Sequence, residues 1–247
     1  MKRVLLAVLL LTLAVGCAQR QPDRDALTVF AAASLKSAFT EIGKQFEADN
    51  PGTRVEFSFA GSSDLVTQLT QGAHADVFAS ADARNMDKAA SAGLLAGDPV
   101  NFASNTLTIV VRPGNPKNIN ALRDLEQPGV STVVCAPQVP CGSATQKVEQ
   151  SAGVKLVPVS EESSVTDVLN KVTSGQADAG IVYVTDAEDA GEKISAVPLP
   201  EASTAVNTYP IAVLKDAGNA DLAKRFVDAV TGEAGQKVLG EAGFAKP

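Results

Sequence analysis

The sequence predicts an α/β protein made of two lobes of like construction. Strand and helix patterns alternate from residue 27 onward, the second half repeats this order, and two short segments resemble each other. Such alternation is typical of mostly parallel sheets flanked by helices. With 247 residues, the chain is long enough for one large domain or two of ordinary size.

The first half of the chain reads as β-α-β-α-β. A strand at residues 27–30 leads to a helix with Ser34 as its N-cap, in which apolar side chains recur at the helical period. The run Asn50-Pro51-Gly52 ends this helix. The remaining predicted elements are a strand at 55–59, a helix opened by Gly61-Ser62-Ser63 and a strand at 76–79.

The second half repeats this order and then returns to the first lobe. Its predicted elements are strands at 106–111, 130–135, 154–159 and 179–183, a helix that starts at Ser143 and a helix at 165–173. A strand at 211–214 and helices at 222–230 and 234–239 follow. We therefore expect discontinuous lobes, with residues 27–108 and 206–247 in lobe 1, residues 109–205 in lobe 2, and two hinge strands between them.

Two segments echo each other in the two halves. Ser63-Asp64-Leu65 precedes Ala75-Asp76, and Thr166-Asp167-Val168 precedes Ala177-Asp178. A tandem of similar units is one explanation. Convergence is an equal one, because Asp is common at helix starts and ahead of strands.

The N-terminus has the pattern of a secretory signal peptide. Lys2 and Arg3 precede an apolar run at 4–15, which is too short to cross a bilayer comfortably as a helix. The small residue Gly16 then precedes Cys17. We expect cleavage after residue 16 and export of the mature chain.

A small residue followed by cysteine resembles a bacterial lipobox, in which the cysteine is lipidated. Cys17 is then the lipid anchor, and residues 17–26 form a tether between the lipid and the folded domain. The protein is then held at the outer face of the cell membrane or in the periplasm. Ala14 departs from the pattern, which usually has Leu at that position. Ordinary cleavage that leaves a spare cysteine is the alternative.

Composition and charge exclude several classes of partner. The net charge is −7, and loss of Lys2 and Arg3 makes the mature chain more acidic, so charge attracts neither nucleic acid nor an anionic membrane. Hydrophobic residues make up 45% of the chain and Trp is absent, so Ala, Val, Leu and Ile must build the core. Any site for an anion must therefore be assembled locally.

The sequence gives little support for catalysis. His74 is the only histidine, and it lies in a polar loop without a G-x-S-x-G elbow. Neither a P-loop nor a G-x-G-x-x-G follows the first strand, and no clear pair of acids suggests hydrolysis. We expect no enzyme, no cofactor and no zinc site, with His74 as a surface or structural residue.

The cysteines suggest a disulfide. If Cys17 carries lipid, Cys135 and Cys141 remain, six residues apart in an oxidising compartment. We expect these two to be paired rather than left as free thiols.

The main candidate ligand-binding groups of the chain are hydroxyls and backbone amides at helix starts. Ser34 and Ser62 each follow a strand of one parallel sheet, so their loops emerge at the same edge. The starts at Cys141-Gly142-Ser143 and Ser164-Val165 add two more. A helix N-terminus offers unpaired N–H groups and a positive partial charge, which receive an anion without Lys or Arg. A serine there is more often only a cap, so it is the set of four that indicates an anion site.

Four segments of the chain carry a family resemblance. They are Val29-Phe30-Ala31-Ala32-Ala33-Ser34-Leu35, Phe59-Ala60-Gly61-Ser62-Ser63, Ala75-Asp76-Val77-Phe78-Ala79-Ser80-Ala81-Asp82 and Gly180-Ile181-Val182-Tyr183. In this order, which runs through almost the whole mature chain, they resemble the periplasmic molybdate-binding proteins of ABC transporters. The resemblance implies a two-lobed periplasmic binding protein fold (type II), each lobe a mostly parallel sheet flanked by helices, joined by two hinge strands.

The resemblance also implies a ligand set. An oxyanion lies between the lobes, and its contacts map onto the hydroxyls and amides of Ser34 and Ser62, the backbone amides of Cys141 and Val165, and the Tyr183 hydroxyl. The family often has a small residue at the Cys141 position, and a disulfide there stiffens the loop. The resemblance implies that the protein is a monomer and that its function is to deliver molybdate or tungstate to an ABC transporter permease.

The ligand chemistry agrees with this expectation but leaves alternatives open. Molybdate at neutral pH is a fully deprotonated dianion and suits a site that only donates, whereas hydrogenphosphate favours an acceptor for its proton. Sulfate also needs only donors and differs mainly in size, so a receptor for sulfate or a small organic anion is the first alternative. An exported α/β hydrolase acting on an anionic substrate is the rival from another class.

Overall fold

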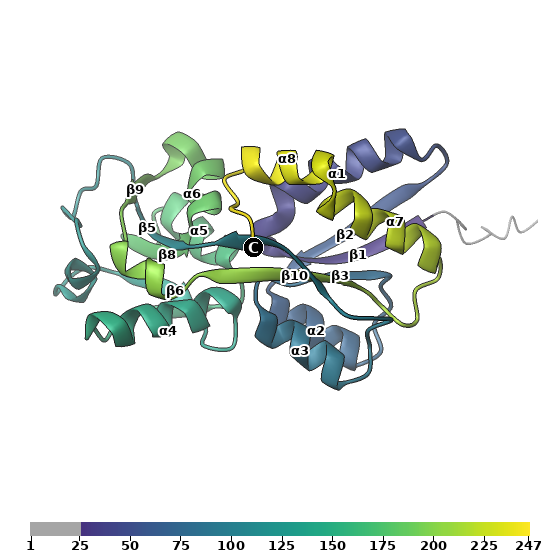
Figure 1. The fold of residues 1–247 in the computed structure, drawn as a ribbon. Helices are drawn as coiled ribbons and strands as arrows, with labels where there is room; N and C mark the ends of the chain where they lie inside the picture. Colours follow the sequence, from purple (N-terminus) through teal and green to yellow (C-terminus); the bar gives the residue numbers. More distant parts are fainter. Residues whose placement is uncertain (1–25) are drawn as a thin grey trace, which may run out of the picture.

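The computed structural model describes residues 26–247, which form two five-stranded sheets side by side (Figure 1). The predicted signal peptide at 1–16 and the lipidation at Cys17 lie outside the described residues. Ala26, assigned to the tether, instead begins strand β1. Within the described part of the chain, no helix is long and apolar enough to span a bilayer.

The first sheet has the strand order β2-β1-β3-β10-β4. Its strands are β1 (Ala26–Ala32), β2 (Arg54–Ala60), β3 (Val77–Ala79), β4 (Val100–Asn105) and β10 (Asn207–Val213). Strand β1 is parallel to β2 and β3, whereas β10 is antiparallel to β3 and β4. The parallel trio therefore ends at one edge, where the loops after β1 and β2 emerge together.

Helices cover both faces of this sheet (Figure 1). One face carries α1 (Lys36–Asp49), α7 (Ala220–Thr231) and α8 (Glu233–Glu241), and the other carries α2 (Ser62–Thr70) and α3 (Ala83–Ser91). Phe39 of α1 packs against Phe226 of α7 and Phe102 of β4, with ring centroids 6.1 and 5.7 Å apart. The C-terminal segments thus return to the first lobe, as the sequence predicted.

The second sheet has the order β7-β6-β8-β5-β9. Its strands are β5 (Leu107–Val111), β6 (Thr132–Cys135), β7 (Ser160–Glu162), β8 (Ala179–Tyr183) and β9 (Ser195–Val197). Its helices are α4 (Pro140–Ala152) on one face and α5 (Val165–Thr173) and α6 (Val184–Ala190) on the other (Figure 1). Four short 3₁₀ helices complete the structure, η1 (Ala33–Leu35), η2 (Leu122–Glu126), η3 (Gly191–Lys193) and η4 (Pro200–Thr204).

The two sheets are built alike. In each, a parallel trio is followed by one antiparallel strand and then an edge strand. Helices α2 and α5 occupy equivalent places, since each joins the second strand of its trio to the third. The sequence segments that echo each other begin at these two helices, and the predicted two-lobed α/β fold is confirmed.

The chain passes between the sheets twice. Asn105 pairs with Asn207 in the first sheet, and Leu107 pairs with Tyr183 in the second, so the crossing after β4 occurs at Thr106. Leu107 and Thr108 belong to the second sheet, although the lobe boundaries predicted from the sequence placed them in lobe 1. The return crossing lies just before Asn207, where β10 begins.

One predicted strand is wrong. Residues 154–159 are irregular, and β7 begins only at Ser160. Two backbone amides that a strand pairing could use instead donate to side chains, Leu156 to Glu149 Oε1 at 2.7 Å and Lys155 to Glu126 Oε1 at 3.3 Å. Pro158 has no N–H to donate.

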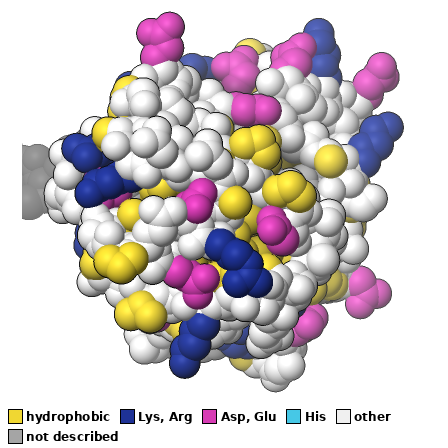
Figure 2. All heavy atoms as spheres, turned by 90° about the vertical axis from the view of Figure 1, so that its left-hand side faces the viewer, with side chains coloured by type: hydrophobic (Ala, Val, Ile, Leu, Met, Phe, Trp, Pro, Cys, Tyr) yellow, Lys and Arg dark blue, Asp and Glu magenta, His cyan; other side chains and the backbone are white. Residues whose placement is uncertain are grey.

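The outer end of lobe 2 shows no concentration of one charge. Lysine, arginine, aspartate and glutamate side chains are interspersed over it with apolar residues between them (Figure 2). This face therefore has no basic patch of the kind that attracts nucleic acid.

Candidate functional site

Ser34 and Ser62 lie in neighbouring loops at the carboxyl edge of the first sheet. Ala32 and Ala60 are register partners at the ends of β1 and β2, which places the two loops side by side. Neither serine is an N-cap as predicted. Ser34 lies within η1, ahead of α1, and Ser62 is the first residue of α2, for which Gly61 is the cap. Both hydroxyls are thus free of capping bonds.

The Ser62 side chain is buried and held in place by the protein. Its Oγ accepts a hydrogen bond from the Ala81 amide at 3.0 Å. Because that oxygen already accepts, the hydroxyl proton of Ser62 remains to be donated elsewhere. The Ser34 Oγ lies 3.0 Å from the Tyr209 hydroxyl.

The second lobe contributes two helix starts. Helix α4 begins at Pro140, three residues before the predicted start, so Cys141 lies in its first turn. Proline suits the first helical position because its missing N–H is not needed there. Val165 is the first residue of α5, and Ser164 caps that helix by accepting from the Asp167 amide at 3.2 Å.

The backbone amides at these starts are available to a ligand. First-turn N–H groups of a helix have no intrahelical acceptor. Within residues 26–247, no protein group accepts a hydrogen bond from the amides of Ser62, Cys141 or Val165. Three N–H groups of buried residues, without an acceptor in that part of the chain, therefore lie at the starts of α2, α4 and α5.

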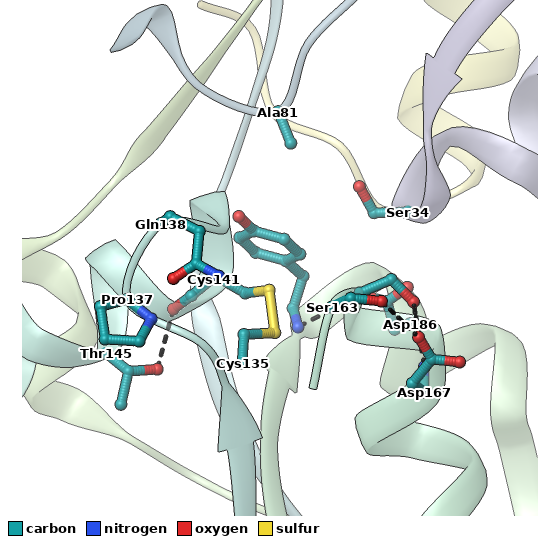
Figure 3. The surroundings of a disulfide bond; sticks show 12 residues. Ser34, Ala81, Cys135, Pro137, Gln138, Cys141, Thr145, Ser163, Asp167 and Asp186 are labelled. Carbon is teal, nitrogen blue, oxygen red and sulfur yellow. Dashed lines mark hydrogen bonds between the residues drawn. A yellow bond between two sulfur atoms is a disulfide. The ribbon is translucent and has the colours of Figure 1, made fainter. Parts of the chain in front are cut away.

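Cys135 and Cys141 form a disulfide across the loop between β6 and α4, with their Cα atoms 5.7 Å apart. In Figure 3, Ala81 and Ser34 of the first lobe lie above the disulfide, and Ser163 and Asp186 of the second lobe lie to its right. The disulfide thus holds the loop that presents the Cys141 amide to the first lobe.

Tyr183 ends strand β8 and is fully buried. Its hydroxyl accepts a hydrogen bond from Asn207 Nδ2 at 2.9 Å. Burial raises the pKa of Tyr183 well above its ordinary value, with the Tyr209 ring and nearby acids adding to the effect. The hydroxyl therefore stays protonated at physiological pH and can act as a donor.

The two lobes are in direct contact around these residues. A Cβ added at Gly61 would lie 2.1 Å from the Ser163 carbonyl oxygen of the second lobe. Arg84 of the first lobe donates to the carbonyls of Pro137 and Gln138 at 3.2 and 2.8 Å. Contacts through Ala81, Asn207 and Tyr209 bring three of the predicted ligand residues together at this junction, namely Ser62, Tyr183 and Ser34.

The charge at the site comes from acids rather than bases. Asp186 Oδ2 accepts from the Tyr183 amide at 3.2 Å, and burial raises the pKa of Asp186 to about 7, with Asp189 adding to the rise. Arg84 is exposed and directed to backbone carbonyls. Attraction for an anion must therefore come from neutral hydroxyls and amides.

A large groove lies next to this cluster but does not contain it. Its volume is about 900 Å³, and it runs between α1, α5, α6 and α8. Ser34 lines it, whereas Ser62, Cys141, Val165 and Tyr183 do not. In the described residues, no group of three or more His, Cys, Asp or Glu side chains is placed to hold a metal ion.

Sequence reasoning missed Asn207 and Tyr209, which hold two of the site hydroxyls. Both lie on β10 and are buried. Polar Asn and Tyr side chains two residues apart in a buried strand were the available signal, because buried polar groups must find partners. Gly61 was recognised only as part of a turn, although it lies where the lobes meet.

The comparisons with known proteins identify the family. Residues 27–245 match the family described as bacterial extracellular solute-binding protein. This chain belongs to that family. It is 61% identical over 221 residues to the molybdate-binding protein ModA of Mycobacterium tuberculosis, an alignment that covers 90% of this chain and 85% of the relative. The resemblance found in the sequence is thus confirmed.

Solved structures of solute-binding proteins share the fold. The periplasmic molybdate-binding protein of Azotobacter vinelandii superimposes with a TM-score of 0.78 at 24% identity, covering 90% of this chain and 99% of that one. The sulfate-binding protein SubI of Mycobacterium tuberculosis gives 0.76 at 22% identity, covering 90% and 86%. At these identities the likeness shows the two-lobed fold alone.

Proposed function

We propose that this protein captures molybdate or tungstate outside the cytoplasmic membrane and delivers it to an ABC transporter permease. The observation that carries the proposal is the 61% identity to a protein named as molybdate-binding over 90% of the chain. The site supports it, because serine hydroxyls, helix-start amides and a protonated tyrosine give an anion only donors. The protein acts by binding, as a monomer anchored through Cys17, and needs no cofactor.

The ligand set in this proposal is the hydroxyls and amides of Ser34 and Ser62, the amides of Cys141 and Val165, and the Tyr183 hydroxyl. A tetrahedral dianion with no proton is matched to such a set, since each of its oxygens can only accept. Neutral donors at helix starts stabilise an anion without a basic side chain. A receptor for sulfate is the second candidate, because the same donors suit it and SubI shares the fold.

Selective stabilisation by ligand tests the proposal. Molybdate and tungstate at 100 times their Kd should each stabilise the folded protein by about 2.7 kcal/mol, which raises Tm by roughly 5–10 °C for a chain of this size. Sulfate and phosphate at the same concentration should give no comparable shift. A thermal-shift series with the four anions measures this, and a sulfate shift equal to that of molybdate would contradict the proposed ligand.

Removing a single serine hydroxyl should weaken binding without unfolding the protein. Ser34→Ala and Ser62→Ala should each cost about 1.5–3 kcal/mol of binding free energy, as for hydrogen bonds to a charged group. Isothermal titration with molybdate measures the loss. Ser91→Ala, at an exposed position of α3, is the matched control and should bind like the wild type. Silent changes at both site serines would place the anion elsewhere.

A further inference from the structure

Asn207 connects the two lobes through one side-chain nitrogen. Its Nδ2 donates to the Ala81 carbonyl at 2.7 Å and to the Tyr183 hydroxyl at 2.9 Å. Ala81 belongs to the first lobe, and its amide is the group that holds the Ser62 hydroxyl. Asn207 itself lies at the start of β10, where the chain enters the first sheet, and is buried.

The Ala81 carbonyl fixes the orientation of the Asn207 amide. A carbonyl oxygen only accepts, so the NH₂ group of Asn207 and not its oxygen must face it. The same NH₂ group then faces Tyr183, whose oxygen must accept. The single hydroxyl proton of Tyr183 is therefore directed away from Asn207, toward another acceptor.

The Tyr183 hydroxyl can then donate this proton to the neighbouring Tyr209 hydroxyl or to the oxygen of a ligand. The Ser62 hydroxyl likewise accepts from the Ala81 amide. Ala81 and Asn207 therefore donate to two hydroxyls from different lobes and leave the proton of each free to be donated. A ligand that brings its own proton, such as hydrogenphosphate, would present that proton to groups that are already donating. A contact between two donors leaves buried polar groups unpaired and opposes binding.

We propose that Asn207 is a positioning residue that holds the Tyr183 hydroxyl as a donor, and that it thereby excludes oxyanions that carry a proton. The inference rests on the proposed function, since it concerns the same oxyanion site. It adds a residue outside the ligand set, on the strand that leads from one lobe into the other. It also assigns that residue a role in choosing between anions of similar shape.

The test is a double-mutant cycle between Asn207 and Tyr183. In N207L the NH₂ group is lost at nearly constant size and without a new charge, so the Tyr183 oxygen no longer accepts from Asn207 and can accept a proton from a ligand. Isothermal titration should show molybdate affinity lowered by about 10-fold in N207L but by no more than about threefold when the same change is made in Y183F. The ratio of phosphate Kd to molybdate Kd should also fall at least tenfold in N207L.

Matched variants separate this role from a structural one. Asn101→Leu, at an exposed position of β4, makes the same chemical change away from the site and should leave molybdate affinity unchanged. If N207L does not fold, N207A removes the same NH₂ group and replaces it in the cycle. Equal losses in the wild-type and Y183F backgrounds, or an unchanged phosphate-to-molybdate ratio, would overturn the inference.

The wild-type titrations keep this inference apart from the proposed function. Wild-type protein that binds sulfate as tightly as molybdate refutes the proposed function. If the wild-type protein selects molybdate but the Asn207 and Tyr183 substitutions have independent effects, only the role of Asn207 is refuted.

Discussion

Gly61→Ala is expected to weaken molybdate binding by about 100-fold or more, a loss of at least about 2.8 kcal/mol. The added methyl group would lie 2.1 Å from the Ser163 carbonyl oxygen and 3.7 Å from Val139 Cγ1, both in the second lobe. The lobes must therefore stay further apart, which lengthens the bonds that we propose Ser62 and Val165 make to the anion.

The fold of each lobe should tolerate this change. Gly61 has φ −59° and ψ 138°, a region open to alanine, so glycine is needed there for space and not for backbone conformation. Isothermal titration measures the affinity, and small-angle scattering should show less ligand-induced compaction than in the wild type. Gly97→Ala is the control, because no atom lies within 4 Å of its added Cβ. Affinity within threefold of wild type in Gly61→Ala would mean that lobe contact does not govern binding.

Asp186→Asn is expected to stabilise the apo protein at pH 8 by about 4 kcal/mol, with little effect near pH 4. Burial raises the pKa of Asp186 to about 7, with Asp189 contributing, whereas the ordinary value is 3.8. The folded state thus holds the proton more tightly than the unfolded state does. Its stabilising effect is complete below about pH 3.8 and is lost as the pH rises through 7.

Asparagine keeps an acceptor for the Tyr183 amide and cannot ionise, so it removes this loss. Urea unfolding at pH 4, 6 and 8 gives the free energies of unfolding, and the difference between variant and wild type should grow with pH. Asp216→Asn, in the exposed turn after β10, is the control and should give a constant difference. Parallel pH profiles for wild type and Asp186→Asn would show that Asp186 is not destabilised by burial.

Local sequence patterns predicted those parts of the fold whose bonds are local. Ser164 was recognised as a helix start, and its side chain does cap α5 by accepting from Asp167, three residues on. Alternating apolar residues in β2 and the periodic apolar face of α1 likewise identified those elements. The strand predicted at 154–159 is wrong because the carboxylates of Glu126 and Glu149, 29 and 7 residues away, accept hydrogen bonds from two of its backbone amides.

The arrangement of the site depended on contacts between residues far apart in the chain. The resemblance named Ser34, Ser62 and Tyr183, but nothing local indicated what holds their hydroxyls. Ser34 meets Tyr209, and Tyr183 meets Asn207, across sequence separations of 175 and 24 residues. Such pairs exist only after strands far apart in the sequence have come together, so a reading of local periodicity cannot supply them.

The disulfide between Cys135 and Cys141 ties together the ends of the loop that accepts from Arg84 and presents the Cys141 amide. A loop constrained before the anion arrives loses less conformational freedom when it binds. Thiols stay reduced in the cytoplasm and oxidise outside it. The preorganised form of this loop is therefore a property of the exported protein, acquired only after the chain has left the compartment in which it was made.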